Sequence, residues 1–318
     1  MKNRSEVWGV LCGIFSHVLF ALSFLFTKEA VDTYSAFTLL SWRFLFALAA
    51  MGICALTGVI RLNLRGKRLW PLVLIAIFQP VLYFLGETYG VKLTTASESG
   101  SLVTFLPIVT IVLCSLIIKE KPTRPQVAGI VVSVAGVLII VLAKGLDASL
   151  NVLGYLMIIL AMTSDALSVV FQRKAMNYTS QEKTFVMAAL GAVAFTGMAL
   201  VQNGINGTLG AFFIAPFADA KFLAAVLYLS VGCQVLAFLM ANYALQTLGA
   251  ARCTSFAGIT TVVAVLAGVL LLRERFTPIQ GAGTALVLAG VYTANYALKS
   301  KDAAALPQEG SCPGEENL

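Results

Sequence analysis

The sequence predicts an all-α integral membrane protein. Ten transmembrane helices are expected to form two inverted five-helix repeats, with both termini in the cytoplasm. Three observations lead to this fold class: a strongly apolar composition, apolar runs long enough to cross a bilayer, and an internal repeat.

The composition excludes a soluble domain. Of the 318 residues, 59% are hydrophobic and 12% are charged, whereas soluble globular domains carry roughly 25% charged residues. The mean hydropathy of +0.89 agrees. The net charge of +7 is expected in loops that face a membrane, so we expect a lipid bilayer and no nucleic acid as partner. The six cysteines form no CxxC pair and are interpreted as small packing residues.

Apolar runs of about 20 residues, the length that crosses a bilayer as a helix, recur along the whole chain. The first run follows Lys2 and Arg4 but is long and lacks a small-residue cleavage site, so we interpret it as a transmembrane helix. Most connections are short, which makes neighbouring helices antiparallel. The ten predicted spans are 7–27, 36–60, 69–91, 97–118, 126–143, 153–171, 184–202, 222–245, 253–272 and 279–298.

The distribution of Lys and Arg predicts the orientation. With the N-terminus inside, 15 of the 22 Lys and Arg residues fall in inside segments and 6 in outside segments, and Arg43 lies within the membrane. Cytoplasmic loops carry such an excess of positive charge, so both termini are expected in the cytoplasm.

The internal repeat divides the chain. Residues 83–144 match the stretch that begins at 237, at an offset of 154 positions. Five spans separate the copies, and because five is odd the two halves are inverted, an arrangement that suits alternating access. The predicted repeats are 1–147 and 148–300, followed by a disordered cytoplasmic tail at 301–318 that is rich in Ala, Pro, Gly and Glu. Identical residues of the two copies include Glu120 and Glu274, Thr123 and Thr277, Gln126 and Gln280, and Gly129 and Gly283.

Further residues join the repeat in a pattern typical of one family: 21–28, Trp42, Arg43, Phe44, 94–101, Pro107, Glu120, Glu274, Gly129 and Gly283. With these residues the chain resembles the drug/metabolite transporter superfamily, of the EamA-like ten-helix type. The resemblance implies a transporter of amino acids, other metabolites or drugs, with a central cavity lined by spans one, three, four, six, eight and nine. Glu87 departs from the family pattern, because many members are apolar or small at this place.

Four ionisable residues lie within predicted spans: His17, Arg43, Glu87 and Asp165. A charge near the bilayer centre costs about 2.5–3.5 kcal/mol, so each is a candidate functional residue. Arg43 and Glu87 both lie roughly 9–12 Å below the outer surface and could pair; the alternative is an ion pair that only fixes helix register. Asp165 and His17 agree in depth within about a turn. Either could carry a proton, because buried carboxyl groups hold protons readily and histidine titrates near neutrality. For His17 the alternative is packing with one hydrogen bond.

Polar residues also follow one face of two spans. Gln79, Tyr83 and Glu87 recur at every fourth position of span three and predict a water-filled cavity. Gln234 and Asn242 belong to a similar face of span eight. Polar contacts between helices are the alternative for this face.

Two prolines are expected to bend helices. Pro80, next to Gln79, removes a backbone donor from span three, and Pro107 is expected to kink span four.

These features predict a secondary transporter of a small metabolite, such as an amino acid or an amphipathic solute, in the plasma or inner membrane. Export is favoured, and both proton coupling and facilitated transport are open. The alternative is an intramembrane lipid-modifying enzyme that uses His17 and Asp165. The inverted repeat favours transport, so we predict a protein that is not an enzyme. We expect no cofactor and no metal site, and a monomer, with a dimer as the alternative.

Overall fold

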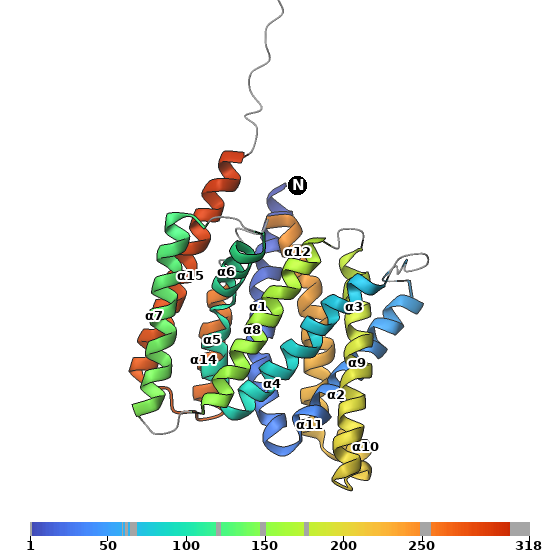
Figure 1. Cartoon of the computed structure of the whole chain (residues 1–318). Helices are drawn as coiled ribbons and strands as arrows, with labels where there is room; N and C mark the ends of the chain where they lie inside the picture. The colour runs from blue at the N-terminus through green and yellow to red at the C-terminus, as the bar shows by residue number, and fades with distance from the viewer. Residues whose placement is uncertain are drawn as a thin grey trace, which may run out of the picture.

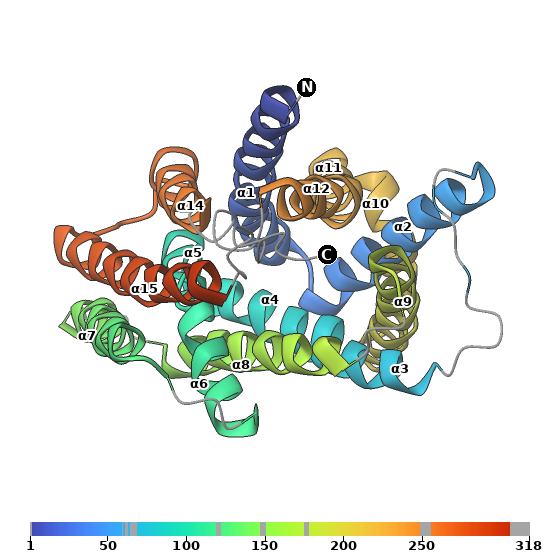
Figure 2. The same ribbon diagram turned by 90° about the horizontal axis from the view of Figure 1, so that it is seen from above.

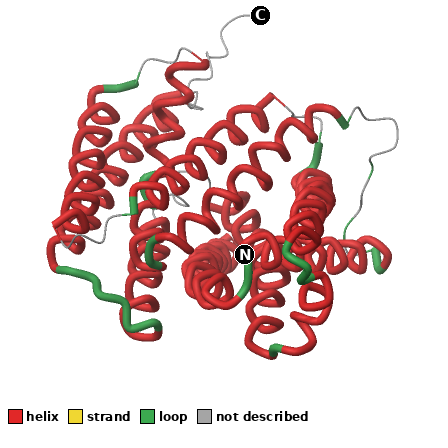
Figure 3. Tube along the Cα trace, turned by 60° about the horizontal axis from the view of Figure 1, so that its bottom comes forward, coloured by secondary structure: helices red, strands yellow, loops and turns green. Residues whose placement is uncertain are grey.

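The computed structural model describes residues 2–58, 60, 63, 69–118, 122–146, 151–174, 178–248 and 256–305. Every regular element among these residues is a helix (Figures 1 and 3). The prediction of an all-helical protein is therefore confirmed for the described part of the chain.

The described residues of the first half form eight helical segments. Polar residues begin several of them: the hydroxyl of Ser35 accepts a hydrogen bond from the backbone of Thr38, and the hydroxyl of Thr95 accepts one from the backbone of Glu98. Such side chains satisfy the free N–H groups of a helix start. The segments are α1 (Lys2–Thr33), α2 (Ala36–Leu56), α3 (Trp70–Ala76), η1 (Ile77–Leu82), α4 (Tyr83–Leu93), α5 (Ala96–Val103), α6 (Leu106–Ile118) and α7 (Arg124–Leu146).

The second half also contains eight described segments. Thr179 and Glu182 form a capping box at the start of α9, and Asp219 caps α11. The short helix α10 lies in a stretch that we had predicted to be a connection. The segments are α8 (Val152–Lys174), α9 (Ser180–Ile205), α10 (Leu209–Ala218), α11 (Ala220–Leu227), η2 (Tyr228–Ala237), α12 (Phe238–Leu248), α14 (Ala257–Leu271) and α15 (Pro278–Ala305).

Helix α15 extends beyond its predicted end. It continues to Ala305, five residues into the predicted tail, and Ala303, Ala304 and Ala305 are strong helix formers. Residues 306–318 lie outside the described part of the chain.

Seven helical stretches in the described part are long and apolar enough to cross a membrane, and three further apolar helices are shorter. The long stretches include Ser5–Thr33, Ala36–Leu56, Trp70–Leu93 and Gln181–Ile205. Length and composition therefore identify a multi-pass membrane protein. The predicted number of ten spans stays a prediction.

Three membrane helices are interrupted near their middle. The Trp70–Leu93 stretch contains the π-helical segment η1, where Gln79 has the non-helical angles φ −136° and ψ 110° and precedes Pro80 through a cis peptide bond. The stretch from Ala220 to Leu248 contains η2. Between α5 and α6 the helix breaks at Thr104 and Phe105, just before Pro107.

The helices pack in pairs around a common centre (Figure 2). Helix α7 packs along α15, α2 along α9, α4 along α8, α1 along α12, and α5 along α14. Buried apolar side chains fill the spaces between pairs. The ring of Phe44, for example, stacks on that of Phe195 and meets that of Phe84 edge to face, between α2, α4 and α9. We call the end of the bundle where α1 begins and α15 ends the terminal face, and the end where α1 ends and α5 begins the opposite face (Figure 1).

Candidate functional site

A cavity of about 320 Å³ lies within the bundle. This volume is at the lower end of the range of small-molecule sites. Its wall combines charged, polar and aromatic side chains from α1, α2, η1, α4, α8, α12 and α14. Six of the eight predicted pathway residues line it, together with one of the two predicted kink residues: His17, Arg43, Gln79, Tyr83, Glu87, Asp165 and Pro107.

Arg43 and Glu87 face each other in this wall. The Arg43 Nη1 and Glu87 Oε2 atoms are 3.9 Å apart, and both side chains are almost fully buried. Neither atom has a hydrogen-bond partner among the described residues, so the contact is a charge pair without a hydrogen bond. The guanidinium also lies over the ring of Phe84, 4.2 Å from its centre, where cation–π attraction adds about 0.5–2 kcal/mol.

The position of Arg43 follows from local sequence. Ser35 caps α2 and fixes the helix start, so Arg43 lies just over two turns inside. Glu87 lies on α4, which begins directly after the interruption at η1 and aims this carboxylate at α2. The wall therefore holds an internally balanced pair of charges.

Asp165 contributes a second carboxylate from α8. Its side chain lines the cavity, and no salt bridge to it occurs among the described residues. The hydroxyl of its neighbour Ser168 lies 2.8 Å from the Asp165 backbone oxygen and 3.2 Å from Gln79 Oε1, and these two acceptors share its single proton. The cavity therefore carries one carboxylate that no cation of the described chain balances.

His17 lines the cavity from α1. Its Nδ1 lies 2.9 Å from the backbone oxygen of Gly13, which makes this nitrogen the protonated one in the neutral ring. Thr260 of α14, also in the cavity wall, donates a hydrogen bond to the backbone oxygen of His17, at 3.3 Å. Asp165 and His17, which lie on different helices, thus share one cavity.

Two predicted residues of span eight stand apart. Gln234 lies in η2 and is 3% exposed, but it is not part of the cavity wall; its Oε1 has no hydrogen-bond partner among the described residues. Asn242 belongs to α12, and its side chain lies outside the described part of the structure.

Sequence reasoning missed the apolar wall and one polar contact. Phe20, Phe24 and Phe238 line the cavity, and Thr104, also in the wall, hydrogen bonds to Thr261 of α14. A phenylalanine in an apolar span has no distinguishing signal. Thr104 lies where the helix breaks between α5 and α6, and Pro107 was the only sequence feature that indicated this break.

The described residues contain no group of three or more His, Cys, Asp or Glu side chains placed to hold a metal ion. A bundle of apolar helices around a partly polar cavity of this size is the architecture of a multi-pass membrane transporter.

Comparisons with known proteins give the family. The EamA-like transporter family model matches residues 7–142 and again 152–296. The chain belongs to this family, within the drug/metabolite transporter superfamily, and is a multi-pass protein of the cell membrane. The predicted resemblance is thereby confirmed.

The chain is also similar to individual proteins. The uncharacterized transporter YcxC of Bacillus subtilis is 33% identical over 95% of this chain and 97% of its own length. A WAT1-related protein of Arabidopsis thaliana, At4g08300, is 24% identical over 80% of this chain and 76% of its own. A crystal structure of another protein, 17% identical, shares the fold with a TM-score of 0.58 over 92% of this chain and 98% of that one.

Proposed function

We propose that the protein is a secondary transporter that moves a small metabolite across the cell membrane by alternating access, with the cavity as its binding site. One observation carries the proposal: a cavity of about 320 Å³ inside an apolar bundle, lined by Arg43, Glu87, Asp165 and His17. Ionisable side chains are costly in a membrane and occur there mainly along substrate or ion pathways.

The proposal includes ten spans in two inverted repeats, with both termini in the cytoplasm. Two findings support it. The family model matches the chain twice in succession. The packing is also consistent with a twofold relation: α1 packs on α12 as its repeat partner α8 packs on α4, while α2 packs on its own partner α9 and α7 on its own partner α15. Inverted repeats of this kind place substrate sites at the repeat interface.

The lining points to an amphipathic solute with an amino group. Asp165 supplies a carboxylate without a salt bridge in the described part of the chain, suited to an ammonium group. The rings of Phe20, Phe24 and Phe238 offer an apolar surface to the body of the solute.

A carboxylate on the same solute would meet Arg43. The Nε and Nη1 atoms of Arg43 have no hydrogen-bond partner among the described residues, so the guanidinium retains donors for it. An amino acid with an apolar side chain fits both requirements. We propose export as the direction, a monomer as the working unit, and Glu87, Asp165 and His17 as the candidates for proton coupling.

Transport by purified protein in proteoliposomes tests the proposal. The panel comprises apolar amino acids, the corresponding amines without a carboxylate, and neutral metabolites, each with and without a pH gradient. The variants are Glu87→Gln and Asp165→Asn, and Glu29→Gln removes an exposed charge outside the cavity as the matched control.

We expect flux of an amino-bearing solute, loss of at least about tenfold in Asp165→Asn, and no change in Glu29→Gln. Loss of the pH effect in one variant identifies the proton carrier. Full flux in both cavity variants would refute the site, and recovery of a covalently altered product would favour the enzyme alternative.

A further inference from the structure

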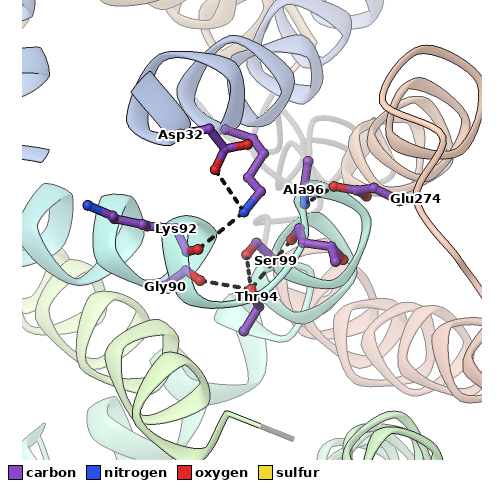
Figure 4. A network of polar contacts seen from close by, with 9 residues as sticks. Asp32, Gly90, Lys92, Thr94, Ala96, Ser99 and Glu274 are labelled. Carbon is purple, nitrogen blue, oxygen red and sulfur yellow. Dashed lines mark hydrogen bonds and ion pairs between the residues drawn. The ribbon is translucent and has the colours of Figure 1, made fainter. Parts of the chain in front are cut away.

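The first turn of α5 is held by a side chain from a distant part of the chain. Glu274 lies in the connection between α14 and α15. Its Oε1 accepts a hydrogen bond from the backbone N–H of Ala96, at 2.7 Å, as Figure 4 shows. Its Oε2 accepts the backbone N–H of Ser97, at 2.9 Å, and the Ser97 hydroxyl, at 2.6 Å. We call these three contacts the Glu274 clamp.

The clamp satisfies groups that the helix itself leaves unpaired. A helix start has free N–H groups and a partial positive charge, both of which favour a carboxylate. Thr95 caps only the next N–H, that of Glu98, at 3.1 Å. The negative charge of Glu274 makes its hydrogen bonds stronger than those between neutral groups.

The connection is shaped around this contact. Arg273 has φ +54°, a left-handed conformation that is unfavourable for a residue with a Cβ atom. The Glu274 N–H then donates to the backbone oxygen of Gly268, at 3.1 Å. A Cβ atom at Gly268 would collide with the Ser97 hydroxyl and the Glu274 carboxylate. Backbone conformation and residue size both make room for the clamp.

Other helix ends converge on the same place. The Lys28 ammonium of α1 pairs with Asp32 and donates to the backbone oxygen of Lys92 at the end of α4, each at 3.2 Å. The hydroxyl groups of Thr94 and Ser99 hydrogen bond at 2.9 Å. Figure 4 shows these contacts side by side. The clamp is thus part of a cluster of polar contacts at the opposite face of the bundle.

Helix α5 connects the clamp to the cavity. Its last residue, Val103, and the next residue, Thr104, line the cavity. Thr104 is eight residues from Ala96, which corresponds to about 12 Å along a helix. Between them, a Cβ atom at Gly100 would lie 2.5 Å from the Cβ of Ala264, so α5 and α14 lie in very close contact. A displacement of the first turn of α5 would therefore move the cavity wall.

We propose that Glu274 is a positioning residue: it holds α5 against α14 and keeps the cavity closed toward the opposite face in this conformation. The inference rests on the proposed transport function, because only alternating access requires this face to open. When the start of α5 moves away from the connection between α14 and α15, water replaces Glu274 as the partner of the Ala96 and Ser97 N–H groups. The strength of the clamp thus sets the balance between the closed and open states of this face.

A distance measurement that needs no substrate tests the clamp. Lys92→Cys at the end of α4 and Ile279→Cys at the start of α15, both at exposed positions, carry spin labels in an otherwise cysteine-free full-length chain in lipid nanodiscs. Glu274→Gln removes the charge and one acceptor. Glu29→Gln removes an exposed charge near the same end of α1. Ser97→Ala removes one of the three donors.

We expect Glu274→Gln to raise the ratio of long to short distances at least about tenfold, which is what the loss of one charge-assisted hydrogen bond produces. Ser97→Ala should give a smaller rise and Glu29→Gln none. Unchanged distances in a folded Glu274→Gln protein would overturn the proposal. If that variant does not fold, unchanged distances in Ser97→Ala would overturn it.

The transport assay separates this inference from the proposed function. Longer distances in Glu274→Gln without flux of any solute by the wild type would support the clamp and refute transport. Where flux occurs, Glu274→Gln should change the maximal rate at least about threefold and leave the KM for the solute within twofold, since Glu274 does not touch the cavity. A changed KM with unchanged distances would refute a positioning role.

Discussion

Removing both charges of the buried Arg43–Glu87 pair should destabilise the protein less than the sum of the two single removals. The two side chains are 5% and 4% exposed, so neither charge is well solvated once its partner is gone. Arg43→Gln leaves an unpaired carboxylate, and Glu87→Gln leaves an unpaired guanidinium. The double variant leaves two neutral amides of similar size.

The separation of the charges gives the size of the effect. At 3.9 Å, Coulomb's law gives about 1 kcal/mol in water and about 4 kcal/mol at an effective dielectric constant of 20. The coupling energy between the two substitutions should fall in this range. Because Phe84 also holds the guanidinium, Glu87→Gln should cost less than Arg43→Gln, by about 0.5–2 kcal/mol.

Reversible unfolding in mixed detergent micelles measures these free energies for the wild type, both single variants and the double variant. The double variant should be more stable than the sum of the two single losses predicts, by about 1–4 kcal/mol. Additive losses, within about 0.5 kcal/mol, would refute the reasoning and show that the two charges do not interact.

Two further pairs of substitutions test packing and capping. Gly136→Ala should lower the free energy of unfolding by about 1–3 kcal/mol, because the new Cβ would lie 2.6 Å from the Gly283 carbonyl oxygen; Gly197→Ala, with no atom within 4 Å, should be neutral or stabilise by up to about 1 kcal/mol. Thr179→Ala should cost about 1 kcal/mol by removing the cap of α9, and Thr179→Ser should retain most of it. The same unfolding assay measures both pairs, and equal losses within either pair would contradict the assignment.

The fold class could be predicted from sequence because membrane helices must be long, apolar and continuous in their hydrogen bonding. The breaks within the membrane helices were harder to predict from the sequence. Pro80 and Pro107 pointed to two of them, whereas η2 contains no proline and has no local signal. Helix α10 was missed because its ten residues, although apolar, are too few to form a span.

The charged residues of the cavity could be predicted because a charge inside a membrane is costly and therefore rare. An Arg, a Glu or an Asp in an apolar run is conspicuous, and the structure places Arg43, Glu87 and Asp165 in one wall. The aromatic part could not be predicted. These helices are apolar on the lipid side as well as inside, so hydrophobic periodicity does not say which face of α1 carries Phe20 and Phe24 inward.

The contact between α7 and α15 has a property that concerns the origin of the chain. At the offset of 154 positions, Gly129 corresponds to Gly283 and Gly136 corresponds to Gly290. Gly129 lies against Gly290, and Gly136 lies against Gly283, so each of these positions contacts the counterpart of the other. An exchange of this kind defines an isologous interface, the type that joins identical subunits of a dimer. The surfaces of α7 and α15 can therefore recognise each other even where no peptide chain connects the two halves. The two halves, produced as separate polypeptides, would therefore retain the means to find each other and assemble.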